Sequence, residues 1–329
     1  MDSTIAEEGE LPRPQTVFLK DTARSIIVNN DSPDVGFTYS INPYRGCEHG
    51  CIYCYARPTH EYFGFSAGLD FETKIFVKED APQLLRETLY SPKWEPTTVA
   101  ISGVTDCYQP VERRLQLTRR CLQVMAEFRN PVTVITKNHL VTRDVDVLSE
   151  LASQHLTVVM LSVTTLDADL ARKMEPRTSA PRRRLEAIET LAKAGVPVGV
   201  MVAPVIPGLT DHEIPSILQA SADAGACTAG YVPVRLPFAV KDMFQDWLAA
   251  HYPDRKEKII NRILSIRNGK LNDSNFHTRM RGHGHFADQF EQMFKLARRK
   301  AELDGPYPEL STKHFRRPPR AGDQMSLFS

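Results

Sequence analysis

The chain has 329 residues, of which 42% are hydrophobic and 25% are charged, and its formal net charge at pH 7 is +1. These values are typical of a soluble globular protein with a sizeable core, and they exclude neither one large domain nor two smaller ones. The sequence has no apolar run long enough to span a membrane, and its acidic start does not resemble a secretory signal, so we expect a cytoplasmic protein without a membrane partner.

The first residues, 1–18, are polar, contain proline and show no periodicity, so a disordered tail is expected there. From Thr38 the chain becomes extended and leads into a loop that contains three of the six cysteines. Cytosolic thiols are normally reduced, which favours metal binding by these cysteines over disulfide formation.

Cys47, Cys51 and Cys54 have the spacing C-x3-C-x2-C, in a loop that also contains Gly46 and Gly50. Three thiolates bind three irons of a 4Fe-4S cluster and leave the fourth iron open, whereas a closed zinc site takes four protein ligands. The remaining cysteines, Cys107, Cys121 and Cys227, have no Cys or His partner at ligand spacing. A zinc knuckle or a four-thiolate cluster stays open as an alternative.

Apolar segments then alternate with helical ones. Strands are expected at about Thr97–Ser102, Val132–Thr136, Thr157–Val163, Val198–Val205 and Gly230–Val234. Helices are expected at about Ala81–Leu89, Val111–Phe128, Arg143–Ala152, Arg183–Ala194 and Glu213–Ala224. This alternation predicts a parallel sheet covered by helices.

With the strand that leads into the cysteine loop, the pattern gives about six units, fewer than the eight of a closed barrel. We therefore expect an α/β fold: an open, partial, TIM-like (β/α)6 barrel over residues 19–240. A helical extension is expected at 241–304, with a break at Pro253, followed by a flexible basic tail at 305–329.

The cysteine spacing, with aromatic Tyr53 before the last cysteine, resembles the signature of the radical SAM superfamily. The wider run NPYRGCEHGCIYCYARPTHEY and the later residues 68–72 resemble the subgroup grouped with spore photoproduct lyase, often called DNA-repair-photolyase-like. The resemblance implies that the open iron of the cluster chelates S-adenosylmethionine (SAM). It also implies that one-electron reduction of SAM yields methionine and a 5′-deoxyadenosyl radical, and that the fold is a partial barrel.

Ligands of parallel α/β folds lie at the carboxyl ends of the strands. There, residues Gly103, Thr105 and Asp106 occupy the place of the Gly-Gly-Glu-like turn that receives the methionyl amino group in the superfamily; the alternative is that Asp106 only caps a helix. Ser162 and Thr164 are placed to meet the ribose.

Arg184 is the first candidate for the partner of the SAM carboxylate, and Arg177 is the second. The alternative for each is a solvated basic turn. Val205 and Ile206 lie in a segment that resembles the adenine-lining segment of the superfamily, although an ordinary strand-to-helix loop has the same pattern. In spore photoproduct lyase a cysteine returns a hydrogen to the substrate radical. Cys107 is the candidate for that role here, and an inert small apolar residue is the alternative.

Two features lie beyond the barrel. The loop His277–His285 contains three histidines beside two arginines, and a metal site, a phosphate-facing basic loop and a structural glycine turn are all open. Gln324–Phe328 resembles the peptide with which bacterial proteins dock on the DNA sliding clamp, and an unbound tail is the alternative.

These features predict a radical SAM enzyme that acts on a nucleic-acid lesion or modified base and receives electrons from a flavodoxin- or ferredoxin-type donor. Radical modification of RNA or protein is one alternative. A non-catalytic iron–sulfur or zinc module that binds DNA is another.

Overall fold

A seven-stranded sheet forms the centre of the computed structural model, which describes residues 15–319. Its strand order is β10-β9-β8-β7-β6-β3-β2. The strands are β2 (Ile27–Asn29), β3 (Tyr39–Ile41), β6 (Val99–Ile101), β7 (Val132–Thr136), β8 (Thr157–Ser162), β9 (Val198–Val205) and β10 (Thr228–Pro233). All neighbours are parallel except β2 and β3. The six parallel strands confirm the predicted open (β/α)6 barrel.

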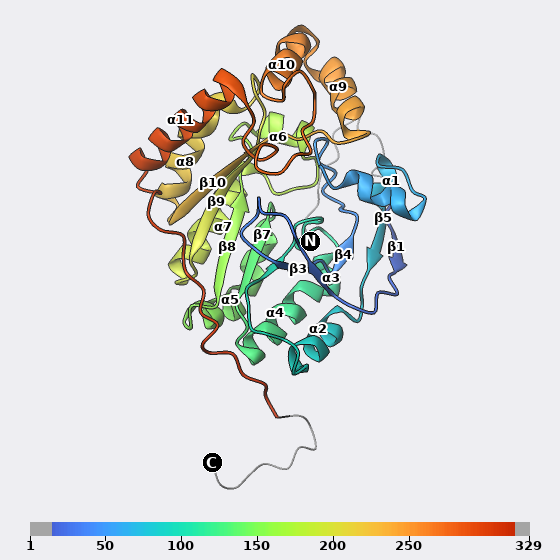
Figure 1. Ribbon diagram of the computed structural model, residues 1–329, viewed down its shortest axis with the longest axis vertical. Coiled ribbons are helices and arrows are strands. Elements are labelled where there is room, and N and C mark those ends of the chain that lie inside the picture. Colours follow the sequence, from blue (N-terminus) through green and yellow to red (C-terminus); the bar gives the residue numbers. More distant parts are fainter. Residues whose placement is uncertain (1–14, 320–329) are drawn as a thin grey trace, which may run out of the picture.

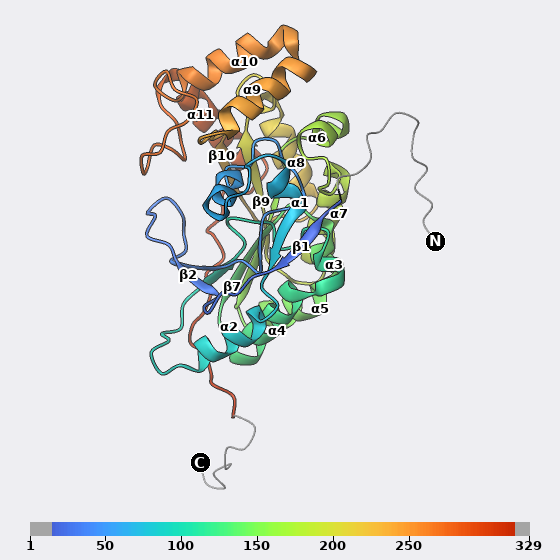
Figure 2. The same ribbon diagram turned by 90° about the vertical axis from the view of Figure 1, so that its right-hand side faces the viewer.

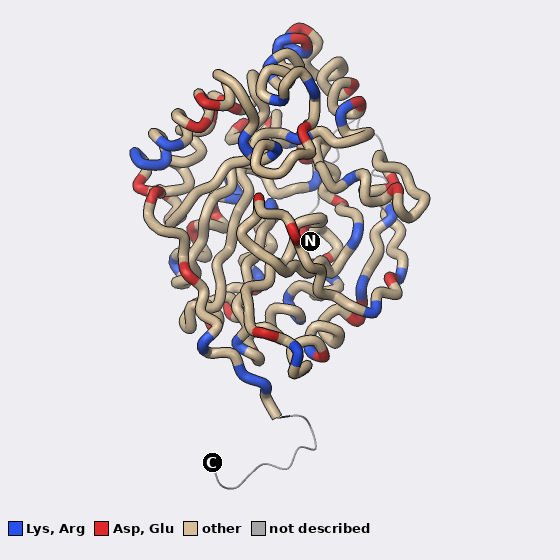
Figure 3. The backbone as a smooth tube through the Cα atoms, in the orientation of Figure 1, with Lys and Arg blue, Asp and Glu red and all other residues tan. Residues whose placement is uncertain are grey.

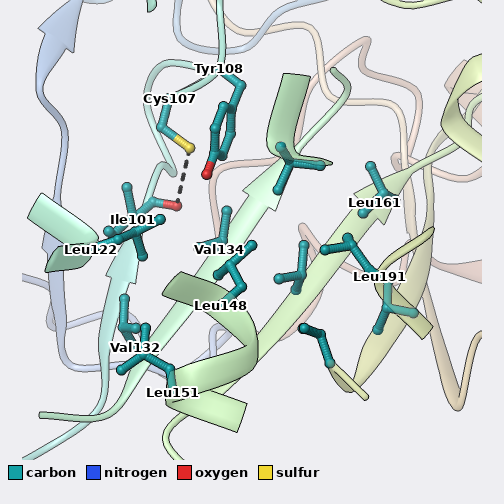
Figure 4. Close-up of a cluster of buried hydrophobic side chains, with 14 of the residues drawn as sticks. Ile101, Cys107, Tyr108, Leu122, Val132, Val134, Leu148, Leu151, Leu161 and Leu191 are labelled. Atoms are coloured by element: carbon teal, nitrogen blue, oxygen red, sulfur yellow. Dashed lines mark hydrogen bonds between the residues drawn. The ribbon is translucent and has the colours of Figure 1, made fainter. Parts of the chain in front are cut away.

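Helices cover the outer face of this sheet and bury its apolar strands (Figure 1). They are α2 (Ala81–Tyr90), α4 (Leu117–Phe128), α5 (Val145–Ala152), α7 (Pro181–Lys193) and α8 (Ile214–Asp223). All six residues of β8 are buried, as expected for a strand covered on both faces. Figure 4 shows the resulting core, in which Val132 and Val134 of β7 pack near Leu148 and Leu151 of α5.

The long helix predicted at 111–128 is interrupted. Gln116 adopts a left-handed conformation (φ 52°) between α3 (Glu112–Leu115) and α4. The Glu112 carboxylate accepts hydrogen bonds from the backbone N–H groups of Thr118 (3.1 Å) and Arg119 (3.3 Å). A side chain of the first helix therefore caps the second, and this cap compensates for the break.

A second, three-stranded sheet lies beside the barrel and was not predicted. Its order is β1 (Val17–Lys20), β5 (Lys74–Val77), β4 (Tyr44–Arg45). The 3-10 helix η1 (Arg57–Phe63) and helix α1 (Leu69–Thr73) connect β4 to β5. The sheet holds the chain at Tyr44 and Arg45, directly before the cysteine loop. The tail predicted at 1–18 therefore overlaps β1 at Val17, and its residues 1–14 lie outside the described part of the chain.

The C-terminal extension contains α9 (Val240–His251), α10 (Pro253–Ser265) and α11 (Gly284–Lys300), and α10 begins at the proline where a break is expected. Further elements are α6 (Ala168–Met174), η2 (His139–Asp144) and η3 (Asp211–Glu213). Helices α9 and α10 lie beyond the carboxyl ends of the strands (Figures 1 and 2). Phe244 and Trp247 of α9 share a buried cluster with Cys51 and Tyr53, so this extension also supports the cysteine loop.

The segment after α11 runs along the barrel to the end opposite α9 and α10 (Figures 1 and 2). The backbone N–H of Arg316 donates to the carbonyl of Phe128 (2.9 Å), and Arg317 donates to the carbonyls of Leu89 (3.2 Å) and Trp94 (3.0 Å). The prediction of a flexible tail from residue 305 therefore does not hold for 305–319. Its arginines satisfy carbonyls at the ends of α2 and α4.

Among residues 15–319, no helix combines the length and the apolar character needed to cross a bilayer.

Replacing Phe315 by alanine tests whether the segment 305–319 packs on the barrel. The Phe315 ring packs against Phe128 of the core, with ring centroids 6.4 Å apart. Losing this partly buried ring is expected to lower the free energy of unfolding by about 1–2 kcal/mol in urea denaturation. Leu296→Ala, at a side chain that is 67% exposed, is the control and is expected to change little. Equal stability of Phe315→Ala and the wild type would contradict the docking.

Candidate active site

The three cysteines of the motif lie in the loop between β4 and η1, near the carboxyl ends of the barrel strands. Cys47 and Cys51 are each 7% exposed, and Cys54 is half-buried. The backbone N–H of Cys47 donates to the Phe71 carbonyl (2.9 Å), and that of Ile52 donates to the Met174 carbonyl (2.9 Å). The loop is thus attached both to α1 and to the end of α6.

A carboxylate that is 11% exposed lies between two arginines and fixes the loop. Arg57 is fully buried and donates to the carbonyls of Cys51 (2.9 Å) and Gly50 (3.0 Å) and to Glu72 (2.5 Å). Arg177 donates to the other oxygen of Glu72 and to the Glu48 carbonyl. Glu72 thus neutralises two guanidinium groups whose remaining donors hold the backbone around Cys51.

Further polar contacts tie the loop to the loop after β6. Gln109 is fully buried; its side chain accepts from the Glu48 N–H (2.9 Å) and donates to the Gly46 carbonyl (3.2 Å). The Glu48 carboxylate accepts from the Val111 N–H (2.6 Å). These contacts leave the cysteine loop little freedom to move relative to the barrel.

The two glycines of the loop are required by its geometry. Gly46 and Gly50 have φ values of +78° and +69°. A Cβ on Gly46 would lie 2.8 Å from His60, and one on Gly50 would clash with the Arg177 guanidinium. Only glycine combines this conformation with such a close approach.

The donor set fits an iron–sulfur cluster. Burial raises the pKa of all three thiols, so the thiolates need positive charge beside them. The irons of a cluster would supply that charge, and each of the three cysteines would hold one iron. Within residues 15–319, no three His, Cys, Asp or Glu side chains are grouped so as to hold a single metal ion.

Glu175 is the centre of a second buried network, at the ends of β8 and β9. It is 2% exposed, accepts from the Tyr53 hydroxyl, and lies 2.7 Å from Thr164 Oγ1. It also accepts from the Arg184 guanidinium. The structure therefore brings the predicted residues Tyr53, Thr164 and Arg184 together, but around a carboxylate of the protein.

Arg184 is committed to this network. It donates to the carbonyls of Ser179 (2.7 Å) and Ser162 (3.0 Å) and to Thr178 Oγ1 (2.6 Å), in addition to Glu175. Its side chain is 1% exposed. The predicted pairing of Arg184 with the SAM carboxylate is therefore not supported, and Arg177 is likewise taken by Glu72. The solvated turn that was the alternative for Arg184 is excluded by its burial.

Lys137, which directly follows β7, belongs to the site and was not predicted from the sequence. Its ammonium lies 2.9 Å from the Ala203 carbonyl, 3.6 Å from Glu175 and 5.8 Å from the Tyr53 ring centroid. Burial and the charge of Arg184 lower the pKa of Lys137 to about 8. Its side chain is 16% exposed, so it is more accessible than Arg184. The rule that strand ends carry the chemistry pointed to this residue.

Asp106 connects the ends of β6 and β7. It accepts from the N–H of Tyr108 (2.8 Å), from Thr136 Oγ1 (2.7 Å) and from the N–H of Lys137 (2.8 Å), and it pairs with His49 (3.4 Å). Burial raises its pKa, but His49 and these hydrogen bonds outweigh burial and lower the pKa to about 2. The carboxylate is ionised, the state that accepts from an ammonium group. Its predicted role toward the methionyl amino group stays a prediction.

The turn after β6 has open space beside it. Ser102 and Gly103 both have positive φ (105° and 118°), and a Cβ on Gly103 would meet no atom closer than Phe37 Cζ at 4.0 Å. Thr105 is 5% exposed and turned inward, where its hydroxyl contacts the Tyr44 carbonyl (3.3 Å). The backbone of Gly103, rather than the Thr105 side chain, therefore faces a space that a ligand can occupy.

The remaining predicted contacts are buried. Ser162 is 6% exposed, and Val205 and Ile206 are fully buried at the end of β9. The Ile206 N–H donates to Thr210 Oγ1 (2.9 Å) and the Val205 carbonyl accepts from the Val234 N–H (2.9 Å). Their positions agree with the predicted edge of the barrel, and their contacts with ribose and adenine stay predictions.

Cys107 lies in the hydrophobic core (Figure 4). It is fully buried, and its thiol points toward the carbonyls of Ile101 (4.0 Å) and Ile135 (3.9 Å). A substrate cannot reach this sulfur without opening the core. The predicted hydrogen-donor role is therefore not supported, and the alternative of a small apolar residue fits its surroundings.

The three histidines of the segment 277–285, the last of which lies in the first turn of α11, have separate partners. His277 lies 3.9 Å from Asp34, His283 lies 3.5 Å from Asp273, and His285 contacts Gln289 at 3.0 Å. They do not converge on one position, and the metal site considered for this loop is not supported.

Comparison with known proteins agrees with this geometry. Residues 41–220 match the family model of the radical SAM superfamily, which is more than half of the chain. The chain therefore belongs to the radical SAM superfamily. It is an enzyme whose cofactors are a 4Fe-4S cluster and SAM, and the non-catalytic alternative does not hold.

Two sequence relatives are named as uncharacterized proteins. One from Mycobacterium tuberculosis is 38% identical over 220 residues, which are 66% of this chain and 65% of the relative. One from Methanocaldococcus jannaschii is 28% identical over 227 residues, 69% of this chain and 81% of the relative. The chain thus spans slightly less than two thirds of the length of the mycobacterial relative that it matches.

The fold is similar to solved structures of spore photoproduct lyase. A mutant with bound AdoMet and dinucleoside spore photoproduct has a TM-score of 0.62 and 16% identity, and covers 91% of this chain and 85% of its own. A second mutant has a TM-score of 0.63 and 16% identity, with 88% and 80% covered. At this identity the similarity establishes the fold.

Replacing Glu72 by glutamine tests the frame of the cysteine loop. The change leaves Arg57 and Arg177 without their shared anion. We expect the free energy of unfolding to fall by about 3 kcal/mol and the cysteine loop to be the part most affected. Iron per chain and absorbance near 400 nm, followed in chelator under anaerobic conditions, should fall faster than in the wild type. Glu61→Gln, at an exposed residue of η1, is the matched control. Equal retention of iron in both variants would contradict the assigned role.

Proposed function

We propose that this enzyme uses SAM-derived radical chemistry to act on a lesion or modified base in DNA. Cys47, Cys51 and Cys54 would hold the cluster, which would supply the electron for reductive cleavage of SAM to methionine and a 5′-deoxyadenosyl radical. The chain itself binds and orients SAM and the substrate and excludes water.

Lys137 is the candidate partner of the SAM carboxylate. It is a partly accessible cation at the strand ends, close to Cys51, whereas the nearby Arg184 is fully engaged. The Gly103 turn, with space beside it, and the ionised Asp106 are candidates for the amino end of SAM. Ser162, Thr164, Val205 and Ile206 remain candidates for the ribose and adenine side.

The observation that carries the substrate proposal is a group of aromatic and arginine side chains at the carboxyl ends of the strands. The Arg235 guanidinium lies 4.6 Å from the centroid of the Tyr55 ring, and Arg279 lies 4.6 Å from that of Phe276. Tyr55, Phe276 and Phe238 are 47%, 47% and 74% exposed. Exposed aromatics beside arginines offer stacking surfaces for bases and partners for phosphates.

This local group matters more than the overall charge. Basic and acidic residues are interspersed along the backbone in Figure 3, in keeping with a net charge of +1. The structural similarity to a lyase with a bound dinucleoside photoproduct supports the same substrate class.

Two partners remain proposals. The chemistry requires a reductant, and a flavodoxin- or ferredoxin-type protein is the proposed donor. Docking on the sliding clamp through Gln324–Phe328 is also proposed, and this peptide lies outside the described residues.

The proposed chemistry predicts a defined product. Anaerobically reconstituted, dithionite-reduced enzyme should form 5′-deoxyadenosine from SAM, and ultraviolet-irradiated DNA should raise the rate at least severalfold over undamaged DNA. Cys51→Ala is expected to abolish the product because one iron loses its ligand. Two results together would contradict the substrate proposal: irradiated DNA leaves the rate of 5′-deoxyadenosine formation unchanged, and the damaged bases are not restored.

Lys137→Met should weaken SAM binding about tenfold or more, because a charge-assisted bond to the carboxylate is lost. Equilibrium dialysis of the reconstituted protein with labelled SAM measures this. Lys193→Met is the control, because that lysine is 74% exposed at the carboxyl end of α7, where the chain leads to the amino end of β9. An unchanged dissociation constant for Lys137→Met would remove this residue from the SAM site.

A further inference from the structure

Arg235 occupies a special position beside the proposed site. It lies two residues after β10, and its guanidinium covers the ring of Tyr55. Tyr55 directly follows Cys54, and its hydroxyl donates to the Gly103 carbonyl. Arg235 is therefore adjacent to both the cysteine loop and the Gly103 turn.

Arg235 makes no hydrogen bond or ion pair with any residue between 15 and 319, although it is partly buried. Burial lowers its pKa, and the positive charge of Arg279 adds to this effect. By contrast, the buried Arg57 and Arg184 donate to carbonyls and carboxylates. The Tyr55 ring contacts Arg235 but offers no hydrogen-bond acceptor to its N–H groups. Keeping a partly desolvated cation without a hydrogen-bond acceptor or an anion is costly, which points to a ligand rather than to a role in stability.

Arg279 brings a second positive charge to the same place. It comes from the loop between α10 and α11 and is held by Asp34 (2.6 Å) and by Ser32 Oγ (2.5 Å). Asp34 therefore pairs with Arg279, and Arg235 can pair with an anion from a ligand.

A third arginine fixes these two segments to each other. Arg267, 1% exposed, donates to the carbonyls of Val234 (2.8 Å) and Pro233 (3.1 Å) and to that of Arg279 (2.8 Å). The strand end that carries Arg235 and the loop that carries Arg279 are thus joined by one buried guanidinium. The positive pair is preorganised before any ligand arrives.

We propose that Arg235, assisted by Arg279, binds a backbone phosphate of the DNA substrate. The planar fork of Arg235 suits bidentate contact with a phosphodiester, and the exposed rings of Phe276 and Phe238 suit the flanking bases. This subsite rests on the proposed function and deepens it, because it identifies which part of the substrate the protein holds. A phosphate held there places the neighbouring nucleotide beside the Gly103 turn.

Binding of a fluorescein-labelled, thymine-containing single-stranded 12-mer to the anaerobic holoenzyme tests the subsite. Arg235→Gln should weaken binding about tenfold, and the slope of log K against log salt concentration should become shallower by about 0.7 as one phosphate contact is lost. Arg235→Lys should restore the slope and only part of the affinity, because it keeps the charge and loses the fork. Lys193→Gln, a charge change at an exposed position at the carboxyl end of α7, should change neither quantity.

The outcomes separate the two proposals. Unchanged affinity and slope in Arg235→Gln, with the wild type binding the 12-mer, overturn the phosphate subsite alone. A selective loss of SAM affinity in Arg235→Gln also overturns it, by assigning the residue to the cofactor. A wild type that does not bind the 12-mer overturns both the subsite and the DNA substrate. Binding that depends on Arg235, without stimulation of 5′-deoxyadenosine by irradiated DNA, supports the subsite and rejects the lesion chemistry.

Discussion

The carboxylate of Glu72, held between Arg57 and Arg177, is the contact on which the cysteine loop depends. The loop itself has almost no regular structure, so its carbonyl groups need donors from elsewhere in the chain. Arg57 supplies them to Gly50 and Cys51, and Arg177 supplies one to Glu48. The buried guanidinium of Arg57 and the partly buried one of Arg177 would repel each other without Glu72. The charge balance of this trio therefore fixes where the three thiols lie.

A similar logic governs the adjoining network around Glu175. Its carboxylate joins Tyr53 of the cysteine loop to Thr164 after β8 and to Arg184 of α7. Lys137 lies at the edge of this network: it donates to the Ala203 carbonyl (2.9 Å) and makes longer contacts with Thr164 (3.4 Å) and Glu175 (3.6 Å). Arg184 is thus committed to the structure, whereas the partly accessible Lys137 can bind a ligand. A preformed arrangement of this kind lowers the cost of orienting SAM.

The sequence predicted those features that depend on local pattern. Strands β7 and β9 match the expected ranges because both are rich in β-branched or apolar residues and are mostly buried. The short strands β1 and β4 have no such pattern, and their pairing with β5 depends on residues distant in the chain. The break at Gln116 was missed because its compensating cap comes from the Glu112 side chain.

In the site, too, local features could be predicted from the sequence, and those that depend on tertiary contacts could not. The cysteine motif was readable because its spacing is local, and the strand-end rule located the remaining parts. The contacts of the individual side chains could not be predicted from the sequence. Arg184 pairs with Glu175, and the thiol of Cys107 points into the core, because of tertiary packing. The tail after residue 305 was misjudged for a related reason. Its composition resembles disorder, yet Arg317 satisfies carbonyls at the end of α2.

The central claim is that the three cysteines hold a cluster with one iron open to SAM. Electron paramagnetic resonance of the anaerobically reconstituted and reduced enzyme, recorded with and without SAM, tests it most directly. The account predicts a reduced 4Fe-4S signal that SAM changes in shape and g values, because the cofactor becomes a ligand of the open iron. A cluster signal that saturating SAM leaves unaltered would contradict it.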